Sequence, residues 1–197
     1  YPGRYDARQD LATLLTTLAD LAAAGRPDGL AASVPWPPRV VLVDASPEDR
    51  AALARAAAKV GVGDAVTYAP GLTEAGRAAL VRGARAAILP VVSEAAGLPV
   101  IEAIACGTPV VASAVGALPE LVGAAGLLVE SRDADRLAVA LRAMWSDDDV
   151  AYKAFVDADE VGARNVAGAR GRHVDGVRVA RAAHRVAQQQ RGARARV

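Results

Sequence analysis

Two glutamates flank a Gly-Leu-Pro segment near the middle of the chain. Glu94 and Glu102 lie eight positions apart in the run VVSEAAGLPVIEA. A short apolar run precedes Glu94, and Pro99 suits the first turn of a helix. In open parallel sheets, ligands bind where the carboxyl ends of strands lead into helices. We therefore expect the two carboxylates at the start of a helix, at such an edge.

The backbone amides at this helix start predict an anion site. The N–H groups of Ala96, Gly97 and Leu98 are expected to lack partners within the helix, whose amino end carries partial positive charge. Glycine at position 97 lets a ligand come close to the backbone. A carboxylate repels phosphate but accepts charge-assisted hydrogen bonds from a diol. The pattern therefore predicts a diphosphate between two diols, which is the shape of a nucleotide sugar.

The spacing of Glu94 and Glu102 can also arise by chance. Two glutamates at this spacing are common, and a helix can expose Glu102 to water without any ligand. The surrounding strand, glycine-containing loop and proline-started helix favour the functional interpretation.

Other chemically capable residues are less well placed. The run Asp147-Asp148-Asp149 follows an expected helix end and is typical of a solvated turn. His173 and His184 have no cysteine or acid at ligand spacing. No metal site is therefore predicted.

Composition limits the classes of function. The chain has 197 residues, of which 53% are hydrophobic and 4% aromatic, with a net charge of +1. This predicts one globular core and no nucleic-acid partner. The single cysteine, Cys106, is typical of a reducing cytoplasm. No apolar run reaches the length of a bilayer span, so membrane contact is expected to be peripheral at most.

Apolar runs alternate with amphipathic segments, which predicts an α/β fold with a parallel sheet. Strands are expected at 40–43, 65–68, 86–89, 109–113 and 126–129. The main helices are expected at 10–24, 46–59, 98–106 and 133–145, with another starting at Thr73 and a short element at 118–122. Residues 1–146 are interpreted as a nucleotide-sugar-binding domain. Residues 147–197 are interpreted as a helical, glycine-interrupted tail with a disordered end.

Residues 93–141, SEAAGLPVIEAIACGTPVVASAVGALPELVGAAGLLVESRDADRLAVAL, closely resemble a known family. They resemble the C-terminal, donor-binding domain of retaining GT-B glycosyltransferases of glycosyltransferase family 4. The Glu-x7-Glu pattern, EAIACGTPVV, LPELV and GLLV follow that family's order and spacing, and the likeness extends over about 2–145. The resemblance implies a Rossmann-like open parallel sheet with helices on both faces, the C-terminal half of a GT-B fold.

The resemblance also implies roles for individual residues. Glu94 would contact the transferred sugar, and Glu102 the ribose. Arg4 would neutralise the departing diphosphate, which the amides of Ala96, Gly97 and Leu98 would hold. The base would lie against the loop 69–72, which contains Gly71. The only small molecule implied is the nucleoside-diphosphate sugar, with no metal or other cofactor.

Some positions depart from the family pattern. Gln9 stands where the family has a lysine that helps Arg4, and the adjacent Arg8 is a possible substitute. On a helix, however, neighbouring side chains point about 100° apart. The N-terminal GT-B domain and the first strand, which would precede Gly3, are both missing from the printed chain.

The resemblance therefore leaves two main functional readings. In the first, the chain is the donor-binding half of a retaining hexosyltransferase, inactive alone and completed by an N-terminal domain in cis or in trans. In the second, it is a non-catalytic nucleotide-sugar-binding or regulatory half. A related GT-B epimerase or phosphorylase half shares the sheet but is disfavoured by the Glu-to-Glu spacing.

Overall fold

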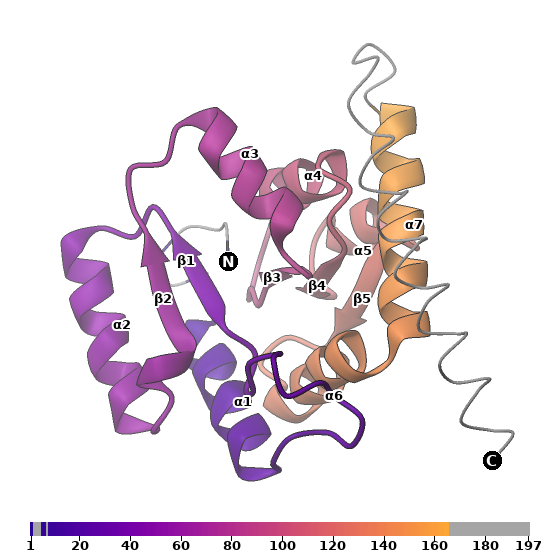
Figure 1. Cartoon of the computed structure of the whole chain (residues 1–197). Coiled ribbons are helices and arrows are strands. Elements are labelled where there is room, and N and C mark those ends of the chain that lie inside the picture. The colour runs from indigo at the N-terminus through magenta and orange to yellow at the C-terminus, as the bar shows by residue number, and fades with distance from the viewer. Residues whose placement is uncertain (2–4, 7, 166–197) are drawn as a thin grey trace, which may run out of the picture.

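The computed structural model describes residues 1, 5–6 and 8–165, in which strands and helices alternate along the chain (Figure 1). The strands are β1 (Val40–Val43), β2 (Val66–Ala69), β3 (Ala87–Leu89), β4 (Val110–Ser113) and β5 (Gly126–Val129). The helices are α1 (Leu11–Ala23), α2 (Pro47–Lys59), α3 (Glu74–Gly83), α4 (Leu98–Ala105), α5 (Leu118–Val122), α6 (Ala134–Ser146) and α7 (Asp148–Asn165), with a 3-10 turn at Gly63–Ala65. Each expected element is present within a few residues of its expected ends.

All pairs of the named strands are parallel, as the alternation of apolar runs with amphipathic segments predicted. They form two ladders, β1-β2 and β3-β4-β5. Leu42 pairs with Tyr68 in the first ladder, and Val111 pairs with Ile88 and Leu127 in the second. Among the described residues no ladder joins β1 to β3, so the expected single sheet is divided between these two strands.

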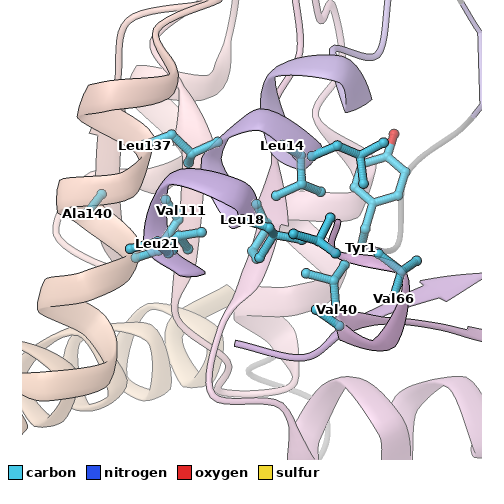
Figure 2. Packing of buried hydrophobic residues seen from close by; sticks show 14 of the residues in the cluster. Tyr1, Leu14, Leu18, Leu21, Val40, Val66, Val111, Leu137 and Ala140 are labelled. Carbon is cyan, nitrogen blue, oxygen red and sulfur yellow. The ribbon is translucent and has the colours of Figure 1, made fainter. Parts of the chain in front are cut away.

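Helices cover both faces of the strands, which confirms the predicted layers. On one face, Ile88 and Val111 join the core with Leu14, Leu18 and Leu137 of α1 and α6; Figure 2 shows part of this packing. On the other face, Leu89 and Val110 pack with residues of α4, α5 and α7. Because successive strand residues point to opposite faces, strands covered on both sides must be continuously apolar.

Side-chain caps start several helices where the sequence indicated. The hydroxyl of Ser46 accepts a hydrogen bond from the N–H of Asp49, and Thr73 caps α3 through the N–H of Gly76. Asp10 and Asp133 cap α1 and α6 in the same way. Each cap satisfies an amide that the helix itself leaves unpaired.

The acidic run after α6 joins two helices. Asp147 accepts hydrogen bonds from the N–H groups of Asp149 and Val150 at the start of α7, and Asp148 lies 3.6 Å from Arg85. Helix α7 packs against α4 and buries Ala158. In the described part of the chain, no cluster of three or more His, Cys, Asp or Glu side chains is placed to hold a metal ion.

Some expectations fall outside the described residues. These concern Arg4, both histidines and the tail from residue 166 onward. The division at residue 146 also stays a prediction. Within the described residues, no helix has both the length and the apolar character needed to cross a bilayer.

Candidate functional site

The loop between β3 and α4 lies at the carboxyl end of β3, as the sequence predicted. Helix α4 begins after Gly97, which adopts a left-handed conformation with φ +62°. A Cβ at Gly97 would meet the end of the Leu121 side chain, which can turn aside, so the positive φ is the reason why glycine is favoured here. The helix tip is partly open to solvent: Ala96 is exposed and Leu98 has 60% of its surface accessible, whereas Gly97 between them is buried.

The Glu94 carboxylate binds the backbone at this tip. Its Oε1 accepts hydrogen bonds from the N–H of Ala96 at 3.1 Å and of Gly97 at 3.0 Å. The hydrogen bond from Gly97 is the main reason why the pKa of Glu94 lies below its usual value. The backbone N–H groups of Ala96 and Gly97, which were expected to bind diphosphate, thus donate to a carboxylate of the same loop in this structure.

The loop after β4 fixes the backbone of Glu94. Gly116 has φ +54°, and a Cβ at this position would overlap the carbonyl oxygen of Glu94. Gly116 follows β4 at the same edge of the strands as Glu94, and the structure brings the two residues into contact. Glycine at position 116 thus lets the β4–α5 loop support the β3–α4 loop.

Glu102 lies one turn into α4 and is held by an arginine. Its Oε2 is 3.0 Å from a guanidinium nitrogen of Arg77 on α3. The same guanidinium lies 3.1 Å from Asp44, which directly follows β1 and has the unusual φ of +55° for a residue with a side chain. The three side chains are 28% to 54% exposed, so the cluster is accessible to a ligand. We call it the Asp44–Arg77–Glu102 cluster.

The segment before α1 runs beside this edge. The carbonyl of Arg8 accepts a hydrogen bond from the N–H of Val92 at 2.7 Å, and Gln9 forms an antiparallel bridge with Val91. Arg8 and Gln9 therefore precede the helix, and the argument from a 100° helical rotation does not apply to them. The reason is that α1 starts only at Leu11, after its Asp10 cap.

The side chains of Arg8 and Gln9 have different surroundings. The exposed guanidinium of Arg8 pairs with Asp6 at 2.7 Å, and its charge contributes to the low pKa of Glu94. The side-chain oxygen of Gln9 instead accepts a hydrogen bond from the buried Tyr1 hydroxyl. Of these two residues, Arg8 is the one whose charge acts on the Glu94 site.

Gly71 lies in the loop after β2, with φ +65° and open space where a Cβ would stand. Because β1 and β2 are parallel, this loop shares an edge with Asp44, whose N–H donates to the carbonyl of Ala69. Through Arg77, Asp44 is connected to Glu102. The described site residues thus gather at the carboxyl ends of β1, β2 and β3.

Comparison with known proteins identifies the family. Residues 2–147 match the model of the family described as Glycosyl transferases group 1. The chain belongs to this family. No curated protein matches it significantly.

Solved glycosyltransferase structures resemble this group 1 domain. Sucrose-phosphate synthase from Thermosynechococcus elongatus is 28% identical with a TM-score of 0.65, over 97% of this chain and 44% of that one. HepE from Anabaena, solved in complex with UDP, is 19% identical with a TM-score of 0.67, over 95% of this chain and 47% of that one. The C-terminal domain of LpcC, a group 1 glycosyl transferase of Francisella tularensis, gives 19% identity and a TM-score of 0.64, over 84% of this chain and 87% of that one. The chain thus spans less than half the length of the first two structures.

Two polar residues of the group 1 domain were missed by sequence reasoning. Asp44 directly follows an expected strand, a position that could have marked it as an edge residue. Arg77 gave no such signal, because a helical arginine is ordinarily a solvated residue. Its link to Asp44 and Glu102 depends on how α3 packs against its neighbours.

Proposed function

We propose that this chain binds a nucleoside-diphosphate sugar as the donor half of a retaining glycosyltransferase that resembles family 4 of the GT-B enzymes. The observation that carries the proposal is the partly exposed tip of α4, where the N–H groups of Ala96 and Gly97 donate hydrogen bonds to the carboxylate of Glu94. Glu102 follows on the same helix and faces solvent beside Arg77. An anion site with an acid on either side suits a diphosphate between a sugar and a ribose.

Donor binding exchanges one anion for another in this proposal. The diphosphate replaces the Glu94 carboxylate at the amides of Ala96 and Gly97. The released carboxylate then accepts hydrogen bonds from hydroxyls of the sugar, where charge-assisted bonds are strong. Glu102 accepts hydrogen bonds from the ribose, and the base lies against the loop at Gly71.

Cleavage of the glycosidic bond places negative charge on the leaving diphosphate. Fixed N–H dipoles and cations at that position lower the barrier. The amides of α4 supply the dipoles, and Arg8, together with Arg4, supplies positive charge. Arg8 takes the part that the resembled family gives to a lysine at the position of Gln9.

The complete reaction requires a second domain that binds the acceptor, in the same polypeptide or in another. The matched solved chains support this inference, because each of the two longer ones extends well beyond the part that the present chain covers. The isolated chain is accordingly expected to bind donor without transferring the sugar.

One observation favours the non-catalytic alternative. Gln9 is uncharged, and its side chain is engaged by Tyr1. The positive charge at the diphosphate then rests on the arginines alone. Adding an N-terminal GT-B domain separates the two readings: transfer of sugar supports the enzyme, and binding without transfer supports a regulatory half.

Thermal-shift screening against nucleoside diphosphates and their sugars tests the proposed site. A true ligand at a hundredfold excess over its Kd stabilises the fold by about 2.7 kcal/mol. The shift should vanish in Glu102→Ala and persist in Asp20→Ala, which removes an exposed acid from α1. Chelation of divalent metal should leave the thermal shift unchanged. No shift with any nucleotide, or an equal loss in both variants, contradicts the proposal.

A further inference from the structure

The Asp44–Arg77–Glu102 cluster forms a line across the carboxyl ends of the strands. Nη2 of Arg77 lies 3.0 Å from Oε2 of Glu102, and Nη1 of the same guanidinium lies 3.1 Å from Oδ2 of Asp44. Asp44 follows β1, Arg77 belongs to α3 and Glu102 to α4, so the line runs from the end of the first ladder across α3 to α4 (Figure 1). The arginine thus holds the carboxylates of two distant elements beside each other.

The backbone of Asp44 indicates a use for its side chain. Its φ of +55° is a left-handed conformation, in which glycine carries no steric penalty. A residue with a Cβ is strained there, although Asp and Asn tolerate it best, and such strain clusters at binding sites. The N–H of Asp44 donates to the carbonyl of Ala69 at 3.1 Å, which fixes this backbone beside the loop after β2. A carboxylate that is 44% exposed is thus held where glycine would be less strained.

The carboxylate of Asp44 can accept further hydrogen bonds. The bond from Arg77 reaches Oδ2, and an ionised carboxylate offers about four acceptor sites on its two oxygens. It has no hydrogen to donate. Asp44 is therefore suited to a ligand group that carries an N–H, and it disfavours a group that presents a lone pair.

The position of the ribose determines which part of a nucleotide meets Asp44. This step rests on the proposed function, in which the diphosphate lies at the tip of α4, the ribose at Glu102 and the base against the loop at Gly71. Asp44 lies between the last two, because it is joined to Glu102 through Arg77 and to this loop through Ala69. Ribose hydroxyls share a side of the nucleotide with the sugar-facing edge of the base. Asp44 therefore meets that edge of the base.

The bases differ in what this edge presents. Beside the pyrimidine O2, uracil carries an N–H at its third ring position, whereas cytosine has a lone pair there. Guanine carries an amino group on its sugar-facing edge, whereas adenine has only a C–H at that position. Uracil and guanine can therefore donate to a carboxylate, while cytosine repels its charge and adenine leaves it unpaired.

We propose that Asp44 selects the base of the nucleoside diphosphate by accepting a hydrogen bond from the ring N–H of uracil or the amino group of guanine. Arg77 is a positioning residue, because it holds the Asp44 carboxylate beside Glu102. The site accordingly takes UDP and GDP in preference to CDP and ADP. A hydrogen bond to a charged group, set against a carboxylate left unpaired, changes affinity by about tenfold or more.

Calorimetric titration of the chain with UDP, GDP, CDP and ADP tests this selection. UDP and GDP should bind about tenfold or more tightly than CDP and ADP. Asp44→Asn keeps a side chain that tolerates positive φ, but its amide can donate to the lone pair of cytosine. It should therefore lower the ratio of UDP affinity to CDP affinity by about tenfold or more. The matched control is Asp64→Asn, at an exposed aspartate before β2, which should leave the ratio unchanged.

Two further titrations separate selection of the base from other effects. Pyrophosphate, which has no base, should bind Asp44→Asn and the parent chain with similar affinity. Arg77→Leu should narrow the preference for UDP over CDP as well as weaken binding of both, because Asp44 loses the group that orients it.

The outcomes distinguish this inference from the proposed function. Equal affinities for the four nucleotides, tighter binding of CDP or ADP, or an unchanged ratio in Asp44→Asn would overturn the role of Asp44 and leave the donor site standing. An equal change of the ratio in Asp64→Asn would overturn it as well. If neither the nucleotides nor pyrophosphate bind, the proposed function fails and the inference fails with it.

Discussion

The carboxylate of Glu94 lies 3.0 Å from the backbone nitrogen of Gly97 and accepts its hydrogen bond. An acidic side chain thus occupies the helix tip at which the proposed diphosphate binds. Donor and carboxylate compete for the same N–H groups, and this competition links the position of Glu94 to the occupancy of the site. The predictions for Glu94 and its neighbours follow from this relationship.

Substitution of Glu94 should separate the binding of nucleotide from the recognition of sugar. In Glu94→Ala the amides are no longer occupied, so UDP or GDP should bind at least as tightly as before. The additional affinity for the corresponding nucleotide sugar should disappear, because the hydroxyls lose their acceptor. Loss of the hydrogen bonds from Ala96 and Gly97 should lower stability by about 1 kcal/mol. Calorimetric titration measures both affinities. A parallel loss of both would contradict the proposal that the diphosphate replaces the Glu94 carboxylate at the backbone amides.

Arg77 should matter for binding more than for folding. The partly exposed ion pairs to Asp44 and Glu102 contribute about 0–1 kcal/mol each, so Arg77→Leu should change Tm little. It leaves two acids facing the site without their cation, and nucleoside-diphosphate affinity should fall by about threefold to tenfold. Arg82→Leu, at an exposed arginine of the same helix, is the matched control. Equal affinities of the two variants would show that the cluster lies outside the site.

Gly116 should be far less tolerant than another glycine with a similar backbone. Gly116→Ala places a Cβ against the carbonyl of Glu94, whereas Gly61→Ala, also at positive φ, meets open space. The cost at Gly61 should be the backbone strain, about 1–2 kcal/mol. Gly116→Ala should cost more and also weaken nucleotide binding, because the Glu94 loop must shift. Denaturant unfolding measures the difference in the free energy of unfolding. Similar losses of stability in both variants would contradict the close packing of Gly116 against the carbonyl of Glu94.

In a chain that starts at Tyr1, as printed, the buried amino group of this residue should make stability depend on pH. Burial, followed by the charge of Arg77, lowers its pKa from 8.0 to about 5. Between these values the unfolded state binds more protons, so the free energy of unfolding should rise from pH 5 to pH 8 and then level off. Acetylation of the amino group should remove this part of the slope. An identical pH profile for the acetylated chain would show that the amine is not buried in solution.

Local sequence determined most of the secondary structure. It also determined that the candidate site lies at the carboxyl ends of the strands. Apolar runs such as 40–43 and 110–113, caps such as Ser46 and Thr73, and Gly97 before Pro99 each act over a few residues. The alternation of strands and helices then required a parallel sheet, whose carboxyl edge collects the connecting loops. For this reason the positions of Glu94, Gly97 and Glu102 at a helix start could be predicted.

Contacts between distant segments were decided only by the tertiary structure. The bonds from Arg77 to Asp44 and Glu102 span 33 and 25 positions, and that from Tyr1 to Val41 spans 40. No local pattern encodes such pairs, because they depend on how helices pack and which strand edges face each other. The occupation of the α4 amides by Glu94 also escaped prediction. Sequence indicates that those amides bind an anion, but only the loop conformation determines which anion lies within reach.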